Sequence, residues 1–336
     1  MMVLSPGEPK GPPPPEMLLG RMLAGFMESQ ALHVAARLAI GDVLRAGPTT
    51  SGAIADAVGA HEPSLRRLLR FLTAMGVLTE DGEGRFAATP LGELLRSDHP
   101  RSLRRAALLM GAPFIWRPWG ELYETTVSGQ PAFDRVYGEP FFAYLGHSPE
   151  DAAVFNELMT SSTNLTATLS AFDFSGFTKI VDVGGGQGTL LRGILERYPH
   201  ATGVLFDLPS VVADAHKLKD PTMSARCEIV GGDMFEAFPP GGDVYVLKRI
   251  VHDWSDAEAI QILRNCRQVI SEQGRILLIE RIIHLNDSSP DLMMLILVTG
   301  RERTEDEFRE LYAAAGFKVG RIIPAGEHSI IEGVPV

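Results

Sequence analysis

Cysteine is almost absent from this chain of 336 residues, which contains only Cys227 and Cys266. Two separated thiols exclude a disulfide framework and offer no paired motif for zinc, so the composition fits a reducing cytosol. Long apolar runs are also missing: the longest, LMMLILV at residues 292–298, is far shorter than the roughly 18 to 20 residues that cross a bilayer. We therefore expect a cytoplasmic protein that does not enter a membrane.

Positive charge is scarce as well. Lys and Arg number 31 against 42 Asp and Glu, which gives a formal net charge of -11. Nucleic acids and anionic lipids bind cationic surfaces, so this balance argues against both as partners. The first residues, MMVLSPGEPKGPPPPEM, lack the apolar core of a signal peptide, and their prolines oppose helix and strand alike. We expect residues 1–15 to be a disordered leader, and the remaining length predicts two domains.

Residues 16–104 have the pattern of an all-helical domain of the winged helix-turn-helix type. A capped helix, a turn through Gly59 and a second helix from near Pro63 precede a polar turn, EDGEGR, between the apolar pieces GVLT and FAATP. Arginines on the exposed side of the second helix could contact DNA phosphates, so a DNA-binding regulator is an alternative that the acidic total charge opposes. The apolar side carries Leu65, Leu68, Leu69 and Leu72, and the exposed side carries Arg66, Arg67 and Arg70.

Residues 105–170 read as connecting helices rich in aromatic and methionine side chains. We expect most of these side chains to pack in the protein interior and a minority to line a pocket for a flat acceptor, and the sequence does not choose between them. The candidates are Phe114, Trp116, Trp119, Phe141, Phe142, Tyr144, Phe155 and Met159.

From residue 171 to residue 336 short apolar runs alternate with helical segments. This rhythm predicts an α/β domain with a mostly parallel sheet covered by helices on both faces. The last two runs, KVGRII and SIIEGV, are separated only by PAGEH, which allows a terminal antiparallel hairpin at one edge. The earlier runs are KIVDV, GVLFD, EIVGGD, DVYVLK and RILLIE.

A glycine cluster in IVDVGGGQGTLL lies directly between a strand and a helix. Gly184, Gly186 and Gly188 allow a tight turn and a close approach of the backbone to a ligand. A dinucleotide fingerprint would need a small residue where Thr189 stands, so the register favours a different nucleoside cofactor. Asp182, just before the cluster, either holds the loop or faces an ammonium group of that cofactor.

The next strand ends deliver further polar residues to the same edge of the sheet. Asp207 can accept hydrogen bonds from both ribose hydroxyls, or it can cap a helix. Asp233 can accept the adenine amino group while Met234 and Phe235 flank the ring, or it can be an ordinary turn residue. Lys248 is either a surface charge or a partner near a cofactor carboxylate. Three strand ends in succession, each of which brings an acid or a glycine to the same edge, predict a binding site, because open sheets bind ligands at this edge.

A catalytic base can be placed beside this site. His252 follows the fourth strand in LKRIVHDWSD and therefore lies at the same edge. Glu280 ends the fifth strand and Glu302 precedes a helix that starts near Thr304, and either carboxylate could accept the other ring N–H of His252 and stabilise its cation. The alternative for Glu302 is a capping role on that helix.

Together these motifs resemble the plant caffeic acid and chalcone O-methyltransferases and their bacterial relatives that modify antibiotics and other secondary metabolites. The resemblance covers nearly the whole chain. It implies a class I methyltransferase domain with a Rossmann-like sheet at residues 171–336, connecting helices that line the acceptor pocket at residues 105–170, and a winged-helix part that forms a homodimer. The matching motifs are VDVGGGQG, FDLP, GGDMF, LKRIVHDWSD, IERII, LMML and GRERTEDEFRELYAAAGF.

The resemblance also implies a function and a site. S-adenosylmethionine would contact Gly184, Asp207, Asp233, Met234 and Lys248, with Gly186 and Phe235 added from their positions in the motifs. His252, between Glu280 and Glu302, would deprotonate an aromatic hydroxyl. This step costs about 5 kcal/mol if a phenol of pKa near 10 loses its proton to an ordinary histidine. Met159 and Met294 would lie against a flat acceptor, although LMML has an equally good reading as helix packing.

The sequence departs from the plant members of this family, and other functions are also compatible with it. Arg249 stands where plant members commonly have tryptophan, which is typical of the bacterial members. The sequence contains no acidic cluster of the catechol type, so we expect transfer without a metal. The alternatives are methylation of a ring nitrogen, a relative that uses the cofactor for hydroxylation or decarboxylation, and, outside enzymes, the winged-helix regulator.

Overall fold

The computed structural model describes residues 13–161, 165–213, 215, 218, 220–284 and 289–336. The chain divides into two compact units, with the division between Trp116 and Arg117. Residues 1–12 of the predicted leader lie outside the described part, and helix α1 (Pro15–Arg37) begins shortly after them. None of the described helices is long and apolar enough to cross a membrane.

The first unit contains the predicted helix-turn-helix and its wing. Helix α3 (Ser51–Val58) begins at Thr50, whose side chain accepts the N–H of Ala53, and ends at Gly59 in the left-handed conformation. Helix α4 (Glu62–Ala74) follows, and the antiparallel strands β2 (Leu78–Glu80) and β3 (Arg85–Ala88) form the wing. A short strand that the sequence did not indicate, β1 (Thr49–Thr50), pairs with β3.

Helix α4 packs through the predicted leucine face. Leu65, Leu69 and Leu72 are buried in the core of this unit. On the other side, Arg66 and Arg70 both form ion pairs with Glu80 of the wing. These two arginines therefore have an acidic partner within the same unit, whereas the DNA-binding alternative would have them contact DNA phosphates. The remaining elements of the unit are α2 (Ile40–Val43), η1 (Leu44–Ala46), η2 (Gly92–Leu95), α5 (Arg104–Met110) and α6 (Pro113–Trp116).

The second unit is built on a seven-stranded sheet of order β6-β5-β4-β7-β8-β10-β9. The first five strands are parallel, as predicted. The terminal hairpin is present, but the outermost strand is β9, and β10 lies between β8 and β9 and is antiparallel to both. A crossover through α17 places β9 two positions beyond β8, and the tight turn after β9 returns β10 into the position between them. The strands are β4 (Lys179–Val183), β5 (Thr202–Asp207), β6 (Cys227–Gly231), β7 (Val244–Lys248), β8 (Arg275–Glu280), β9 (Phe317–Ala325) and β10 (His328–Pro335).

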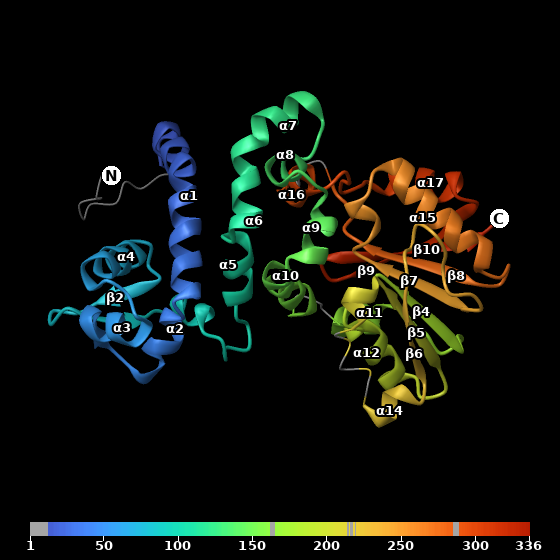
Figure 1. Cartoon of the computed structure of the whole chain (residues 1–336), viewed down its shortest axis with the longest axis horizontal. Coiled ribbons are helices and arrows are strands. Elements are labelled where there is room, and N and C mark those ends of the chain that lie inside the picture. The colour runs from blue at the N-terminus through green and yellow to red at the C-terminus, as the bar shows by residue number, and fades with distance from the viewer. Residues whose placement is uncertain (1–12, 162–164, 214, 216–217, 219, 285–288) are drawn as a thin grey trace. The chain divides into compact units, whose positions relative to one another are not determined.

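Helices cover both faces of this sheet (Figure 1). One face packs against α15 (Asp256–Val269) and α17 (Glu305–Ala314), and the other packs against α12 (Thr189–Arg197) and α14 (Pro221–Ser224). Alternate strand residues supply the two cores, so Val181 and Val183 face α15 while Ile180 faces α12. Burial on both faces explains why the parallel strands read as continuous apolar runs rather than as alternating patterns.

In the second unit, residues 117–161 and 165–171 form a series of short helices. Several of their aromatic side chains form a connected cluster, in which Phe141 contacts Phe133, Phe142 and Phe155. Phe142 also lies 5.7 Å from the ring of Trp254, just beyond the end of β7. Most predicted aromatics therefore do pack among themselves. The elements are η3 (Arg117–Glu121), α7 (Leu122–Ser128), α8 (Ala132–Tyr137), α9 (Phe141–His147), α10 (Pro149–Ser161) and α11 (Leu165–Ala171), while α13 (Pro209–Val212) and α16 (Ser289–Leu297) lie further along the chain.

Candidate active site

The glycine loop connects β4 to α12 at the carboxyl edge of the parallel strands. Gly184, Gly186 and Gly188 have φ angles of +64°, +59° and +76°, a backbone conformation that favours glycine. A Cβ atom at Gly184 would lie 2.3 Å from Ile250 Cδ1, so the loop packs closely against the segment after β7. A Cβ atom at Gly186 would meet no protein atom within 4 Å, so one stretch of the loop faces open space.

Asp207 and Asp182 flank this loop. Asp207, at the end of β5, accepts the N–H of Gly186 at 2.8 Å and the N–H of Leu208 at 2.7 Å, and it does not cap a helix by these bonds. Burial raises the pKa of its carboxyl, and the two backbone N–H groups lower it. Asp182 is buried beneath Gly185, burial raises its pKa to about 7, and its Oδ2 atom has no hydrogen-bond partner in the described residues.

The loop after β6 is held by a side chain of α15, a helix further along the chain. Asp233 accepts the N–H of Phe235 at 2.8 Å. This contact within the chain is that of an ordinary turn residue, which was the alternative to a role in adenine binding. Asn265 of α15 donates to the carbonyl oxygens of Met234 at 2.9 Å and Phe235 at 2.8 Å. Asn265 was missed in the sequence because it appears there as one polar residue on an amphipathic helix.

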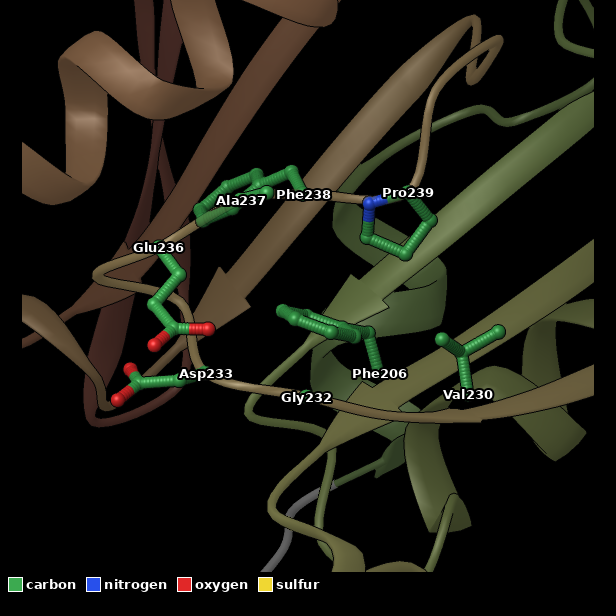
Figure 2. Close-up of a pocket in the computed structure, with 8 residues that line it drawn as sticks. All are labelled: Phe206, Val230, Gly232, Asp233, Glu236, Ala237, Phe238 and Pro239. Atoms are coloured by element: carbon green, nitrogen blue, oxygen red, sulfur yellow. The ribbon is translucent and has the colours of Figure 1, made fainter.

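A pocket of about 270 Å³ lies beside this loop (Figure 2). Asp233 is the only predicted cofactor residue in its lining, so the pocket adjoins the site rather than forming it. The rings of Phe206 and Phe238 face its interior in the close-up. The lining residues are Phe206, Val230, Gly232, Asp233, Glu236, Ala237, Phe238 and Pro239.

His252 lies in a short 3-10 turn, η5 (Val251–Asp253), four residues past the end of β7, and its side chain is buried. The Nδ1 atom lies 3.1 Å from Glu302 Oε1 and 3.9 Å from Glu280 Oε2, while the Nε2 atom lies 3.5 Å from Asp253 Oδ1. Burial by itself lowers the pKa of the imidazole, but the three carboxylates outweigh burial and raise the pKa to about 9. The structure therefore brings together His252 and both predicted carboxylates, and it adds Asp253, which follows His252 directly and was not singled out in the sequence.

Glu280 and Glu302 occupy different positions around the imidazole. Glu280, the last residue of β8, accepts the N–H groups of Ile250 and Val251, each at 2.9 Å, and so also anchors the turn. Glu302 does not cap helix α17, because Thr304 and Glu307 form the capping box there. Within the described residues the second carboxylate oxygen of each glutamate has no hydrogen-bond partner.

Arg303 fixes the backbone on both sides of His252. This fully buried guanidinium donates to the carbonyl oxygen of Val251 at 2.7 Å and to that of Trp254 at 2.8 Å, and it also binds Asp256. Gly300 allows the backbone before Arg303 to pass close to the His252 turn, because a Cβ atom at this position would lie 2.0 Å from the carbonyl oxygen of His252. No spacing rule marks an arginine for this role, so the sequence did not reveal it.

The remaining predicted residues lie on three elements near this turn. Lys248 ends β7, and burial lowers its pKa to about 8, with Arg249 as the second cause. Met159 of α10 contacts the guanidinium of Arg249, 3.3 Å from its sulfur. Met294 lies on α16, whose Asp291 accepts the N–H of Glu302 at 2.9 Å, and it is half-buried there. No group of three or more His, Cys, Asp or Glu side chains in the described parts of the chain is arranged to hold a metal ion.

Comparison with known proteins places this arrangement in a family. Residues 119–318 match an O-methyltransferase domain, and residues 21–98 match an O-methyltransferase dimerisation domain. The chain is 39% identical over 335 residues to the phenazine O-methyltransferase PhzM of Lysobacter antibioticus, with 97% of this chain and 98% of that protein covered. It is 38% identical over 307 residues to the 8-amino-8-demethylriboflavin N,N-dimethyltransferase of Streptomyces davaonensis, with 88% of each chain covered.

A solved structure points to the cofactor. The O-methyltransferase NcsB1 from neocarzinostatin biosynthesis, in complex with S-adenosylmethionine and 2-hydroxy-5-methyl naphthoic acid, superposes with a TM-score of 0.86 at 36% identity, over 92% of this chain and 96% of that one. The fold predicted from the sequence motifs is thereby confirmed. The chain belongs to the O-methyltransferase family and is an S-adenosylmethionine-dependent methyltransferase.

Proposed function

We propose that this enzyme methylates a hydroxyl group of a small aromatic acceptor and that His252 is the general base. The observation that carries the proposal is the buried imidazole with Glu302 at its Nδ1 atom and two further carboxylates within 4 Å. With Nδ1 engaged, Nε2 is the atom that receives the acceptor's proton. The relatives support the choice of a hydroxyl, because phenazine O-methyltransferase is named for this reaction.

The residues at the sheet edge fit S-adenosylmethionine. The open side of Gly186 leaves room for a ligand against the backbone, and Asp207 retains lone pairs for ribose hydroxyls after accepting two backbone N–H groups. The orphaned oxygen of Asp182 suits an ammonium donor, and a turn stabilised by Asn265 presents Asp233 and Met234 for the adenine. The cofactor supplies an electrophilic methyl group, so the chain itself must orient the acceptor and take up one proton.

The raised pKa of His252 suits that proton transfer. An ordinary histidine is about 3.5 pKa units below a phenol, which corresponds to about 5 kcal/mol, and a histidine of pKa about 9 reduces the difference to about 1.4 kcal/mol. The imidazolium that forms lies among Glu280, Glu302 and Asp253, which stabilise its charge. A base with this pKa can take up the proton of a phenol at a small energetic cost when the methyl group is transferred.

Methylation of nitrogen is the second candidate, and a specific relative favours it. The N,N-dimethyltransferase of Streptomyces davaonensis aligns over 88% of this chain, so the fold supports both reactions. The two candidates differ in their need for a base, because an amine of low pKa is nucleophilic without losing a proton first. The carboxylates around His252 favour the hydroxyl.

The proposal includes a homodimer. The chain has an O-methyltransferase dimerisation domain, and α1 exposes large apolar side chains that a partner would cover. Among them Met22, Leu23 and Phe26 are 66%, 72% and 60% exposed within the chain alone. A cytosolic location and the exclusion of nucleic acid and membrane as partners stay predictions.

The decisive experiment separates chemistry from binding. Replacing His252→Asn should lower kcat for an aromatic hydroxyl acceptor by about 10²- to 10⁴-fold and leave the Kd of S-adenosylhomocysteine, measured by calorimetry, within about 2-fold. Equal turnover of the variant and the wild type would contradict the general-base role. Methylation of an aromatic amine by the variant at the wild-type rate, with loss of hydroxyl transfer, would confirm that the base serves only the hydroxyl.

A further inference from the structure

Arg249 adopts an unusual backbone conformation beside the catalytic turn. Its φ angle is +55°, and in the described residues only Ala39 shares a positive φ among side chains other than glycine. The neighbours enforce this conformation, because the N–H of Arg249 donates to Ile279 and the next two N–H groups donate to Glu280. Strain that the surroundings maintain at a site of chemistry indicates a side chain that must be held in one place.

The guanidinium of Arg249 has an incomplete set of partners. Its Nη1 atom lies 3.3 Å from the sulfur of Met159, a weak and uncharged acceptor. Among the described residues no carboxylate lies within ion-pair distance of it, whereas Arg303 and Arg301 both bind Asp256. Asp253 interacts with Arg249 only at longer range and lies 3.5 Å from His252. A half-buried guanidinium of this kind is suited to an anion from outside the chain.

Neighbouring cations add to the positive electrostatic potential around the Arg249 guanidinium. Burial, followed by the nearby cations Arg249, Lys248 and Arg281 in that order, lowers the pKa of His328 to about 4. The negative groups that face this region are Asp253 on the His252 turn and Asp182 and Glu280, which interact with Lys248. None of these three carboxylates is within hydrogen-bond distance of the Arg249 guanidinium.

Resting on the proposed function, we propose that Arg249 binds a carboxylate of the acceptor, so that the natural substrate is an aromatic hydroxy acid. Arg249 precedes His252 by three residues on the same turn, and its contact with Met159 places the guanidinium against α10. A planar guanidinium binds a carboxylate through two parallel hydrogen bonds and thereby fixes the orientation of the attached ring. The acceptor hydroxyl would then be directed to the imidazole.

The carboxylate of the cofactor is the other possible source of the anion. Lys248, which interacts with Asp182 below the glycine loop, is the cation closer to the cofactor side of the site. Arg249 instead contacts α10, where a predicted acceptor residue lies. The two sources predict different effects of an Arg249 substitution on S-adenosylhomocysteine affinity.

The test compares a hydroxynaphthoic acid with the naphthol that lacks its carboxylate. Calorimetry in the presence of S-adenosylhomocysteine should show that the full-length wild-type enzyme binds the acid about 10- to 100-fold more tightly. Arg249→Met should remove this preference and leave the affinities for the naphthol and for S-adenosylhomocysteine within about 2-fold. Arg249→Lys should retain part of the preference. Arg281→Gln, which removes a cation that lies 3.7 Å from Glu327, is the matched control and should keep the full preference.

Each contrary result has a distinct meaning. Equal wild-type affinity for acid and naphthol, or an equal loss of both in Arg249→Met, overturns the assignment of the carboxylate. A loss of S-adenosylhomocysteine affinity in Arg249→Met assigns the arginine to the cofactor and also overturns it. Methyl transfer to the naphthol without preference for the acid leaves the proposed function intact. Binding of S-adenosylhomocysteine with no binding of either aromatic compound refutes the acceptor class and the inference together.

Discussion

Arg303 donates a hydrogen bond to the carbonyl oxygen of Val251, the residue before His252, across 52 positions of the sequence. The same guanidinium reaches the carbonyl oxygen of Trp254, two residues after the histidine. The next residue back along the chain, Glu302, binds the imidazole itself. One segment therefore holds both the backbone and the ring of the proposed base.

This relationship makes Arg303 a positioning residue. Arg303→Met removes the donors and leaves buried acceptors unsatisfied, so we expect kcat to fall by about 100-fold. The Kd of S-adenosylhomocysteine should change by less than about 3-fold, and Arg303→Lys should restore part of kcat. Arg301→Met is the control, because Arg301 also binds Asp256 but donates to neither carbonyl. Equal losses of kcat in the two methionine variants would contradict the role.

Glu302 should set the pH dependence of the reaction. The base must be neutral to accept a proton, so kcat/KM of the wild type should rise with pH until about pH 9, the raised pKa of His252. Glu302→Gln removes one stabilising carboxylate and should shift this limb to lower pH while lowering its plateau. The measurement is a pH profile of kcat/KM, with Glu305→Gln on the exposed start of α17 as a control that leaves the profile unchanged.

Gly186 should matter for cofactor binding more than for stability. Alanine at this left-handed position should destabilise the fold by about 1 to 2 kcal/mol, since its Cβ atom meets no protein atom. The same substitution at Gly138, whose φ is +79° and whose Cβ atom also meets nothing within 4 Å, should have an equal effect on stability. Only Gly186→Ala should weaken S-adenosylhomocysteine binding, by about 10-fold or more in calorimetry. Similar affinities of the two variants would show that no ligand packs against this part of the loop.

Asp182 should make stability depend on pH. Burial raises its folded-state pKa from 3.8 to about 7, so its contribution to stability is present below pH 4 and is lost as the pH rises through 7. Between pH 5 and pH 8 the free energy of unfolding of the wild type should therefore fall relative to that of Asp182→Asn, by about 2.6 kcal/mol. Chemical denaturation of both proteins without cofactor at several pH values measures the difference. Parallel pH curves would contradict the buried, unpaired carboxyl.

The sequence by itself determined the order and type of the main elements and the edge of the sheet where the site lies. These features depend on local patterns: apolar runs of strand length, the glycine cluster between β4 and α12, and the capped start of α3. Because the carboxyl ends of parallel strands meet at one edge, Asp207, Asp233, Lys248 and His252 could be assigned to it before any contact was known.

Only the tertiary structure decided which side chains meet at that edge. The pairing of His252 with Glu302 joins residues 50 positions apart, and Asn265 reaches Met234 from a helix that follows β7. Arg303 and Arg249 have ordinary neighbours in the sequence, and their importance arises from burial and from the partners that the fold provides or withholds. Local propensity contains no information on such contacts, because they form when distant elements pack and exclude water.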